Sequence, residues 1–522
     1  MVLGIAVAIF CASCGESSAP SQADAAEQRT AHALEIARQH PLNLHAFLVD
    51  MPKGADLHNH VGGAIYAESW IRAAVEDGDC VDLATRALVV RPAAGRPGSA
   101  NRSAPAVCGT GQVPASQAYA DGHIYNELID AFSMRGFVAT PGVTGHDHFF
   151  DTFGKFEAEE GPHEGEWLDE VAARAAAQNE QYIEVMITPD FPKAVALSRA
   201  FGWRSESSLS AFRDYLLANG IQEDAAAART LIDKAESDRR KIEHCGESKP
   251  TAACGVEIRC LYQILREAPP EQVFAQTVAG FETISADPRW VGINYVQPED
   301  GHISMTDYAL HMRMVGFLHQ IYPRVHISLH AGELAPGLVP PDGLCCHIRL
   351  AVEQAHAERI GHGVDVMYEE HPYDLLKEMA AKHVMVEINL TSNDVILGVS
   401  GDEHPLPVYR AFGVPVALST DDEGVSRIDI THEYERAVET YELLKYADLK
   451  QMVRTGIEHS FLPGTNLWAQ QDHFDRVTPE CAQDSLGSEK PSANCAKLLQ
   501  SSEKARQEWE LERRFHAFEA TH

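Results

Sequence analysis

Basic residues, long apolar runs and Cys-x-x-Cys motifs are all scarce in this 522-residue chain. Lysine and arginine number 43 against 76 aspartates and glutamates, which gives a formal net charge of −33. So acidic a chain argues against a nucleic-acid backbone or an anionic membrane as a partner. Beyond the N-terminus, no apolar run approaches the ~18–20 residues that a membrane-spanning helix needs. No Cys-x-x-Cys occurs after residue 14, and this argues against a cysteine-based zinc site.

The first residues have the order of an export signal. An apolar stretch, 1–10, is followed by Cys11 and Cys14 and then by a polar segment of small residues. We therefore predict a signal peptide over 1–14, a flexible tether over 15–30 and an exported protein, periplasmic or extracellular. Small residues before Cys14 resemble a bacterial lipoprotein signal, which would attach a lipid to that cysteine. No Lys or Arg precedes the apolar stretch, so a disordered or helical cap is the alternative.

Nine cysteines follow the predicted signal. Six of them bracket loop-like segments that contain Gly, Ser or Pro, and an oxidising compartment would allow each pair to form a disulfide. The expected pairs are Cys80 with Cys108, Cys245 with Cys254, and Cys481 with Cys495. Because nine is odd, at least one thiol stays free or pairs between chains.

The rest of the chain alternates between helical patterns and short apolar runs. We predict an N-terminal helical segment over 31–54, a barrel domain over 55–465 with a loop-rich insertion at 77–121, and a C-terminal helical extension over 466–522. The predicted strands are 55–61, 182–188, 257–264, 291–296, 325–330, 359–361, 385–390 and 415–420. Eight strands separated by helices predict an α/β fold, a (β/α)8 TIM-type barrel, whose reactive residues sit at the C-terminal strand ends.

Four polar segments lie at such strand ends, after strands one, five, six and eight. They are His58-Asn59-His60, His330-Ala331-Gly332-Glu333, Gly361-His362-Gly363 and Ser419-Thr420-Asp421-Asp422. His58 and His60 are two residues apart, so on a strand both side chains project from one face. With His330 and Asp421 they offer three nitrogens and one oxygen, a ligand set that suits Zn²⁺ or a similar ion and leaves a position for water.

The remaining polar residues of these segments suggest hydrolytic chemistry. Glu333 lies in a turn beyond the strand and would reach a substrate as proton donor and acceptor, while His362 could orient the attacking water. Asp422 is free to bind substrate. Taken singly, His-x-His is more often incidental, His362 could mark a tight turn and Asp421-Asp422 could cap a helix. Their joint occurrence, in order and at strand ends, favours a metal-dependent hydrolase acting on a ring amidine, an amide or an ester.

These segments resemble the adenosine deaminase family. The resemblance covers about 48–461 and is carried by the five motifs in order, which include Met51-Pro52-Lys53-Gly54-Ala55-Asp56-Leu57-His58-Asn59-His60, Arg359-Ile360-Gly361-His362-Gly363 and Thr391-Ser392-Asn393. The Met-Pro-Lys-Gly lead-in, the early cysteine-bearing insertion and the expected export are similar to its secreted branch, the adenosine deaminase-related growth factors. The resemblance implies a (β/α)8 barrel, zinc, and hydrolytic conversion of adenosine to inosine and ammonia. The secreted branch often dimerises through N-terminal helices, so the resemblance also implies that 25–50 could form a homodimer contact.

Residue roles follow from the same resemblance. His58, His60, His330 and Asp421 match the zinc ligands, Glu333 the residue that protonates the purine ring, and His362 the residue that holds the attacking water. Asp422 matches a residue that binds the five-membered ring, and 149–156, with Phe153, is similar to the pocket-lining segment of the secreted branch. His60, Gln297 and Glu299 complete the expected substrate contacts. The cytidine-deaminase type of zinc site combines His-x-Glu with Pro-Cys-x-x-Cys, and this combination is absent because the chain has no Pro-Cys-x-x-Cys.

Two departures bear on the substrate. Gln297 stands where the family carries glycine in Gly-x-Glu after the fourth strand, and Tyr182-Ile183-Glu184-Val185-Met186 lacks the expected arginine. Neither touches the metal chemistry. Three hypotheses follow: a deaminase of adenosine and 2′-deoxyadenosine, a related amidohydrolase acting on another adenine-containing or modified purine nucleoside, and a non-enzymatic binding protein that retains the barrel.

Overall fold

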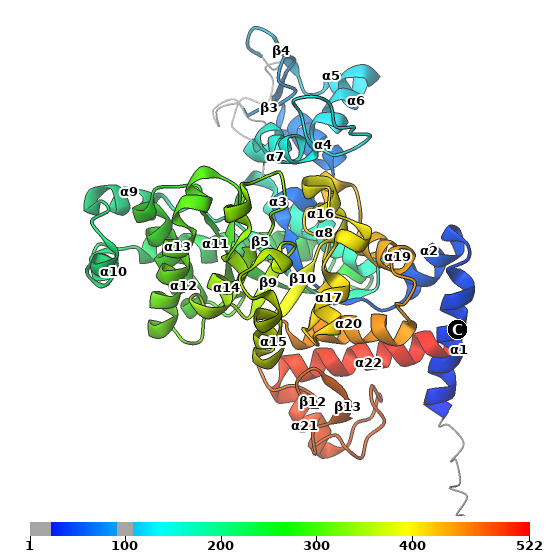
Figure 1. The fold of residues 1–522 in the computed structure, drawn as a ribbon. Coiled ribbons are helices and arrows are strands. Elements are labelled where there is room, and N and C mark those ends of the chain that lie inside the picture. The colour runs from blue at the N-terminus through cyan, green and yellow to red at the C-terminus, as the bar shows by residue number, and fades with distance from the viewer. Residues whose placement is uncertain (1–21, 91–107, 160) are drawn as a thin grey trace, which may run out of the picture.

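The computed structural model describes residues 22–90, 108–159 and 161–522 (Figure 1). Eight strands form one sheet in which every pairing of neighbours is parallel. In sheet order they are β1 (Gly54–His60), β5 (Glu180–Ile187), β6 (Glu257–Leu265), β7 (Trp290–Val296), β8 (His326–Ala331), β9 (Arg359–His362), β10 (Met385–Ile388) and β11 (Val416–Leu418). Each of the eight predicted strands overlaps one of them.

A bridge between Asn59 and Asp421 connects the chain after β11 to β1. The Asp421 N–H donates to the His58 carbonyl at 2.8 Å, and the His60 N–H donates to the Asp421 carbonyl at 3.3 Å. The sheet is therefore a nearly closed barrel, which confirms the predicted fold class. The same closure places Asp421 directly beside the His-x-His pair.

Helices separate the strands and surround them in Figure 1. The main ones are α8 (Glu164–Ala177), α11 (Gln222–Ile242), α12 (Pro270–Ala286), α13 (His302–Ile321), α14 (His347–Glu353), α15 (Pro372–Lys382), α19 (Ile430–Thr440) and α20 (Tyr446–Glu458). Covered on its outer face, β5 is buried along its whole length, as a strand inside a parallel barrel must be. Apolar runs rather than alternation therefore marked these strands in the sequence.

The inserted segment is more regular than expected. Its described part contains an antiparallel sheet of β2 (Cys80–Asp82), β3 (Leu88–Val89) and β4 (Gln112–Pro114), followed by α5 (Gln117–Ala120) and α6 (Gly122–Ala131). Figure 1 shows this unit standing beyond one end of the barrel, with α7 (Gly145–Phe156) beneath it. At Gly145 a Cβ atom would lie 2.0 Å from the Val395 carbonyl oxygen in α16 (Leu390–Leu397), so α7 begins in direct contact with the barrel.

The cysteines pair as the loop pattern suggested. Cys80–Cys108, Cys245–Cys254 and Cys481–Cys495 form disulfides with Cα separations of 5.8, 5.6 and 4.6 Å. The adjacent Cys345 and Cys346, for which no pairing was predicted, are also bonded. Cys260 is the free thiol of the described cysteines and is buried. Cys11, Cys14 and the predicted signal peptide lie outside the described residues.

The two terminal segments pack together along one side of the barrel. α1 (Gln22–Ala37) and α2 (Pro41–Asp50) precede β1, and a hairpin of β12 (Trp468–Gln470) and β13 (His473–Val477) leads into α21 (Ala493–Ser501) and α22 (Glu503–Thr521). Lys450 joins them, with its Nζ 2.8 Å from Glu27 and 2.6 Å from Glu519. The C-terminal segment thus contains a hairpin as well as the predicted helices. Within the described ranges, no helix is both long enough and apolar enough to cross a bilayer.

Candidate active site

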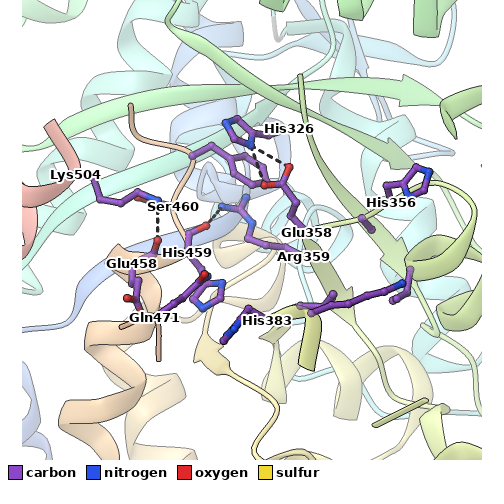
Figure 2. Close-up of a pocket in the computed structure, with 15 residues that line it drawn as sticks. His326, His356, Glu358, Arg359, His383, Glu458, His459, Ser460, Gln471 and Lys504 are labelled. Atoms are coloured by element: carbon purple, nitrogen blue, oxygen red, sulfur yellow. Dashed lines mark hydrogen bonds and ion pairs between the residues drawn. The ribbon is translucent and has the colours of Figure 1, made fainter. Parts of the chain in front are cut away.

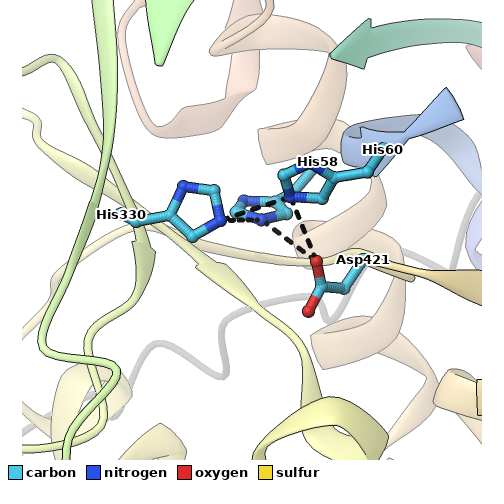
Figure 3. A group of neighbouring side chains, drawn as sticks. All are labelled: His58, His60, His330 and Asp421. Atoms are coloured by element: carbon cyan, nitrogen blue, oxygen red, sulfur yellow. Dashed lines mark hydrogen bonds and ion pairs between the residues drawn. The ribbon is translucent and has the colours of Figure 1, made fainter. Parts of the chain in front are cut away.

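Four side chains from three strand ends converge at one end of the barrel (Figure 3). His58 and His60 come from β1, His330 from β8, and Asp421 from the residues after β11. The Nε2 atom of His330 lies 3.1 Å from that of His58 and 3.3 Å from that of His60. Asp421 Oδ1 lies 3.5 and 3.3 Å from the same atoms of His58 and His60. One ligand-type atom from each residue falls within 4.8 Å of the others.

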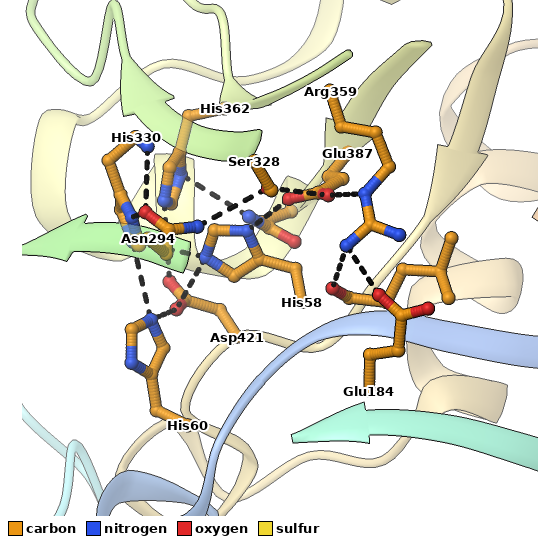
Figure 4. Close-up of polar contacts among 12 residues, drawn as sticks. His58, His60, Glu184, Asn294, Ser328, His330, Arg359, His362, Glu387 and Asp421 are labelled. Atoms are coloured by element: carbon orange, nitrogen blue, oxygen red, sulfur yellow. Dashed lines mark hydrogen bonds and ion pairs between the residues drawn. The ribbon is translucent and has the colours of Figure 1, made fainter. Parts of the chain in front are cut away.

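Each imidazole contacts a second side chain through its outer nitrogen, and Figure 4 shows these contacts for His58 and His330. His58 Nδ1 lies 2.6 Å from Glu387, His330 Nδ1 lies 2.7 Å from the side-chain oxygen Oδ1 of Asn294, and His60 Nδ1 contacts the Gln263 side-chain amide. Glu387 and Asn294 accept the Nδ1 protons of His58 and His330, which fixes the orientation of these two rings and leaves Nε2 of each as the free ligand atom.

The arrangement fits a divalent cation. With their Nδ1 protons directed outward to Glu387 and Asn294, His58 and His330 turn two nitrogen lone pairs toward each other at 3.1 Å. Lone pairs at that separation repel unless a cation or a proton lies between them. Three imidazole nitrogens and a carboxylate oxygen are the donor set that Zn²⁺ accepts. His58, His60, His330 and Asp421 could therefore hold one such ion.

A cavity of about 460 Å³ opens beside these four residues. Of the described residues that line it, none is lysine or arginine. Its walls combine the metal-type residues with an aromatic face from α7 and polar groups from several strand ends: His60, Gly62, Gly63, Phe149, Phe150, Phe153, Phe156, Glu157, Thr188, Gln263, Leu265, Val296, Gln297, Pro298, His330, Glu333, Asp421 and Asp422. The predicted aromatic segment is thus a wall of the cavity as well as part of the core.

The pKa values of three carboxyl groups at the cavity floor are shifted in different directions. Burial, reinforced by the charge of Asp421, raises the pKa of Glu333 well above its usual value, and the same two causes act on Asp422. Burial alone would also raise the pKa of Asp421, but hydrogen bonds with His58 and His60 hold it well below its ordinary range. These shifts favour the ionised form of Asp421 and the protonated forms of Glu333 and Asp422, and a protonated carboxyl can donate a hydrogen bond.

His362 completes this floor. Its Nε2 lies 3.7 Å from Glu333 Oε1 and 4.0 Å from Asp421 Oδ2. Burial lowers the pKa of His362 to about 3, so the ring is neutral. The residue adopts φ +70°, a left-handed conformation that is uncommon for non-glycine residues.

The family model for adenosine deaminase matches residues 168–476, more than half of the chain. The chain belongs to the adenosine deaminase family. It is 35% identical over 136 residues to an adenosine deaminase of Clostridium perfringens, covering 26% of this chain and 37% of that one. With the enzyme of Shewanella loihica it shares 37% over 137 residues, or 26% and 38% of the two chains. The alignments thus span little more than a third of these curated relatives.

The barrel fold is also found in a solved structure, that of the ADAL–IMP complex. The two share 18% identity at a TM-score of 0.50, over 80% of this chain and 94% of that chain. The likeness concerns the fold. His58 and His60 precede the residues matched by the family model, and their place in the site follows from the barrel closure described above.

In this adenosine deaminase family member, Glu299 does not line the cavity. Its two oxygens accept the Gly332 and Glu333 N–H groups, each at 2.9 Å, and His347 Nδ1 lies 2.5 Å from Oε1. Burial opposes ionisation, but the hydrogen bond and charge of His347 lower the pKa of Glu299 to about 2. By binding both backbone N–H groups, Glu299 fixes the turn that carries Glu333. Glycine suits position 332 of this turn, because the φ is +78° and a Cβ there would lie 2.5 Å from Asp365 Oδ1.

Gln297 lines the cavity with a backbone that favours glycine. Its φ is +88°, in the left-handed region where a Cβ causes strain. The side-chain oxygen accepts the Glu267 N–H at 2.9 Å, and the carbonyl accepts from Arg266 Nε at 2.9 Å. The side chain is therefore anchored to the end of β6. The backbone at this position has a positive φ, which suits the glycine expected in this family and which Gln297 adopts here.

The outer partners of the histidines were missed in the sequence. Glu387 lies within Met385–Ile388 and Asn294 within Trp290–Val296, two strands that are otherwise apolar or buried. Both side chains are fully buried. Such a residue needs a partner, because burying an unpaired polar group costs free energy. A lone polar residue in a barrel strand was therefore the available signal. Glu387 has two such partners: it contacts His58 and, at 2.7 Å, Arg359.

A second cavity, of about 390 Å³, contains none of the predicted site residues (Figure 2). It is reached from His326 and Arg359, the first residues of β8 and β9, and therefore lies at the opposite end of the strands. Lys504 and Glu458 line it together with four histidines, so both charge signs are present. Since barrel enzymes react at the C-terminal strand ends, the cavity beside Asp421 is the candidate active site.

Proposed function

We propose that this protein hydrolytically deaminates adenosine and 2′-deoxyadenosine to inosine or deoxyinosine and ammonia. The observation that carries the proposal is a buried Glu333, with its pKa raised well above the usual value, beside three converging imidazole nitrogens and Asp421, in a chain of this family. Deamination at a purine carbon needs a water, a proton for the neighbouring ring nitrogen and stabilisation of the oxygen that adds. The site supplies groups for each of these needs.

We propose one zinc ion per chain, held by His58, His60, His330 and Asp421. When bound, zinc supplies Lewis-acid activation of water. Glu333 donates its proton to the ring nitrogen next to the attacked carbon, which makes that carbon more electrophilic. His362 and Asp421 orient the attacking oxygen. Asp422, protonated and with its Oδ1 unpaired among the described residues, donates to the acceptor nitrogen of the five-membered ring.

The lining of the cavity favours a nucleoside over a nucleotide. A phosphate is normally bound by arginine, lysine or a helix N-terminus. The described lining offers carboxyls and a phenylalanine face instead, and ionised carboxylates repel phosphate. Other adenine-containing or modified purine nucleosides are the second candidate, favoured by one observation: Gln297 places a side chain where the family carries glycine.

The test is the ultraviolet absorbance change when the zinc-loaded protein meets adenosine, with 2′-deoxyadenosine, adenine, AMP and N6-methyladenosine in parallel. We expect turnover of the first two and at least ~100-fold lower kcat/KM for AMP, because an unbalanced buried charge costs several kcal/mol. Turnover of a different purine nucleoside would change the assigned substrate and leave the proposed mechanism as it is. No turnover of any purine by zinc-loaded protein would contradict the proposal and favour the non-enzymatic hypothesis.

Glu299→Gln is expected to lower kcat roughly 10- to 100-fold, as loss of a supporting partner commonly does, with KM changed less than about threefold. An amide can accept from only one of the Gly332 and Glu333 N–H groups and presents its own N–H₂ to the other. The turn beneath Glu333 then shifts while the cavity wall stays in place. Steady-state kinetics with adenosine measure the effect.

Asp224→Asn is the matched control for that variant. Asp224 also accepts two successive backbone N–H groups, those of Lys193 and Ala194 at 3.0 and 2.7 Å, but it joins the outer helices α11 and α9 (Pro192–Phe201). Both variants should lose about 1–3 kcal/mol of stability, and only Glu299→Gln should lose turnover. Equal kinetic losses in the two variants would reduce Glu299 to a general structural role.

We also propose that the protein is exported and is similar to the secreted growth-factor branch of the family. The bonded cysteine pairs support an oxidising compartment. Lipid attachment at Cys14 stays a prediction, since that residue lies outside the described ranges. A homodimer contact through α1 and α2 is supported by two exposed apolar side chains there, Ile36 and Leu42.

A further inference from the structure

A chain of hydrogen-bond contacts runs from the backbone of α17 (Leu406–Ala411) to His362. The Leu406 N–H lies 3.1 Å from His404 Nδ1, and His404 Nε2 lies 3.0 Å from Asn393 Oδ1. Asn393 Nδ2 in turn lies 2.9 Å from His362 Nδ1. His404, Asn393 and His362 are buried, with exposures of 1, 0 and 0%. Buried contacts of this kind have to match each donor with an acceptor.

The direction of every bond in the chain follows from its first member. A backbone N–H can only donate, so His404 Nδ1 is an acceptor and carries no proton. The proton of the His404 ring is then on Nε2 and is donated to the Asn393 carbonyl oxygen. This turns the Asn393 N–H₂ toward His362, whose Nδ1 must accept. Asn389 Nδ2, 3.4 Å from the same Nδ1, is a second amide donor on that side.

We infer that His404 and Asn393 are positioning residues that keep His362 in the tautomer with its proton on Nε2, so that His362 serves the site as a hydrogen-bond donor. The tautomer follows from the contacts alone; its part in turnover rests on the proposed function. The sequence predicted that His362 orients the attacking water, but it did not show whether the imidazole donates or accepts the hydrogen bond.

The resulting N–H points into the floor of the site. His362 Nε2 has no hydrogen-bond partner among the described residues, while Glu333 and Asp421 lie 3.7 and 4.0 Å away. A donor left open between those groups faces the place of the attacking oxygen. There it stabilises charge that develops on that oxygen. With its proton already on Nε2, His362 does not act as the base that deprotonates water.

The test is the nitrogen-15 NMR signature of His362 in full-length, zinc-loaded protein labelled at histidine. The His362→Gln spectrum identifies its two signals. We expect Nε2 in the range of a protonated imidazole nitrogen and Nδ1 in the unprotonated range. The reverse pattern, or two protonated nitrogens, would overturn the inference. Because no substrate is needed, this result stands even if the proposed deamination is not observed.

Asn393→Asp is the sharpest variant. The carboxylate has the same shape and only accepts, so it should draw the His362 proton to Nδ1 and leave a lone pair in the site. Enforcing the wrong tautomer of a catalytic histidine costs up to roughly 10⁴-fold in kcat in serine proteases, and we expect at least a 100-fold loss here with KM nearly unchanged. An unaltered nitrogen-15 pattern with unaltered turnover would overturn the role of Asn393.

Two substitutions at His404 provide the matched pair. His404→Gln keeps a distal N–H donor for Asn393, whereas His404→Leu removes it and frees the Asn393 amide to flip. We expect the wild-type nitrogen-15 pattern and turnover within about threefold for His404→Gln, and mixed tautomers with roughly 10- to 100-fold lower kcat for His404→Leu. Equal behaviour of the two variants would overturn the positioning role of His404.

Discussion

Glu333→Gln is expected to lower kcat for adenosine by roughly 10³-fold or more, within the range attributed to general acid catalysis. Glutamine preserves the size of the side chain but cannot transfer a proton to the purine ring. Burial and the charge of Asp421 raise the pKa of Glu333 well above its usual value, so the acid form persists to a higher pH than for a free glutamate. In the wild-type protein, kcat/KM should therefore fall as the pH rises through that raised pKa. Steady-state rates across pH measure both effects.

Glu157→Gln is the control for Glu333→Gln. Glu157 also lines the cavity, but it is exposed and lies at the end of the aromatic wall rather than at the floor. Its substitution should change kcat less than about threefold, as expected for an exposed group outside the chemistry, while zinc content stays the same in both variants. If Glu333→Gln kept a tenth of wild-type turnover, another group would have to be the acid.

The fold could be predicted because residues able to bind a metal or transfer a proton follow directly after apolar runs that have the length of strands. Apolar runs marked the eight strands, and polar residues directly after four of them marked the reactive end of a barrel. His58 and His60 share a face because a strand repeats every two residues, and the structure places them so. Asp421 belongs with them because the chain after β11 bridges to Asn59 on β1.

Contacts between distant loops could not be predicted in this way. Glu299 was expected to touch substrate, yet it binds the backbone of the turn after β8, a pairing set by how two neighbouring strand ends approach. His404 follows α16 and reaches His362 only through Asn393. The hairpin before α21 and the Cys345–Cys346 bond likewise have no periodic signal. Sequence spacing fixes which face a residue shares, and tertiary packing decides which partner it meets.

Asp421→Asn is expected to weaken zinc binding by at least ~100-fold and to abolish detectable deamination, since it removes the one negatively charged ligand of the site. Asp422→Asn is the matched control, the same substitution one residue on. Asp422 lines the cavity without joining the four converging ligand atoms, so this variant should keep one zinc ion per chain and most of its turnover, because the asparagine N–H₂ can still donate to the purine. Zinc content after dialysis against a chelator, measured beside kcat and KM, separates ligand from substrate contact. Full zinc retention in Asp421→Asn would show that the ion is held by a different set of residues, and loss of zinc in both variants would show that the substitution disturbs the strand end rather than a single ligand.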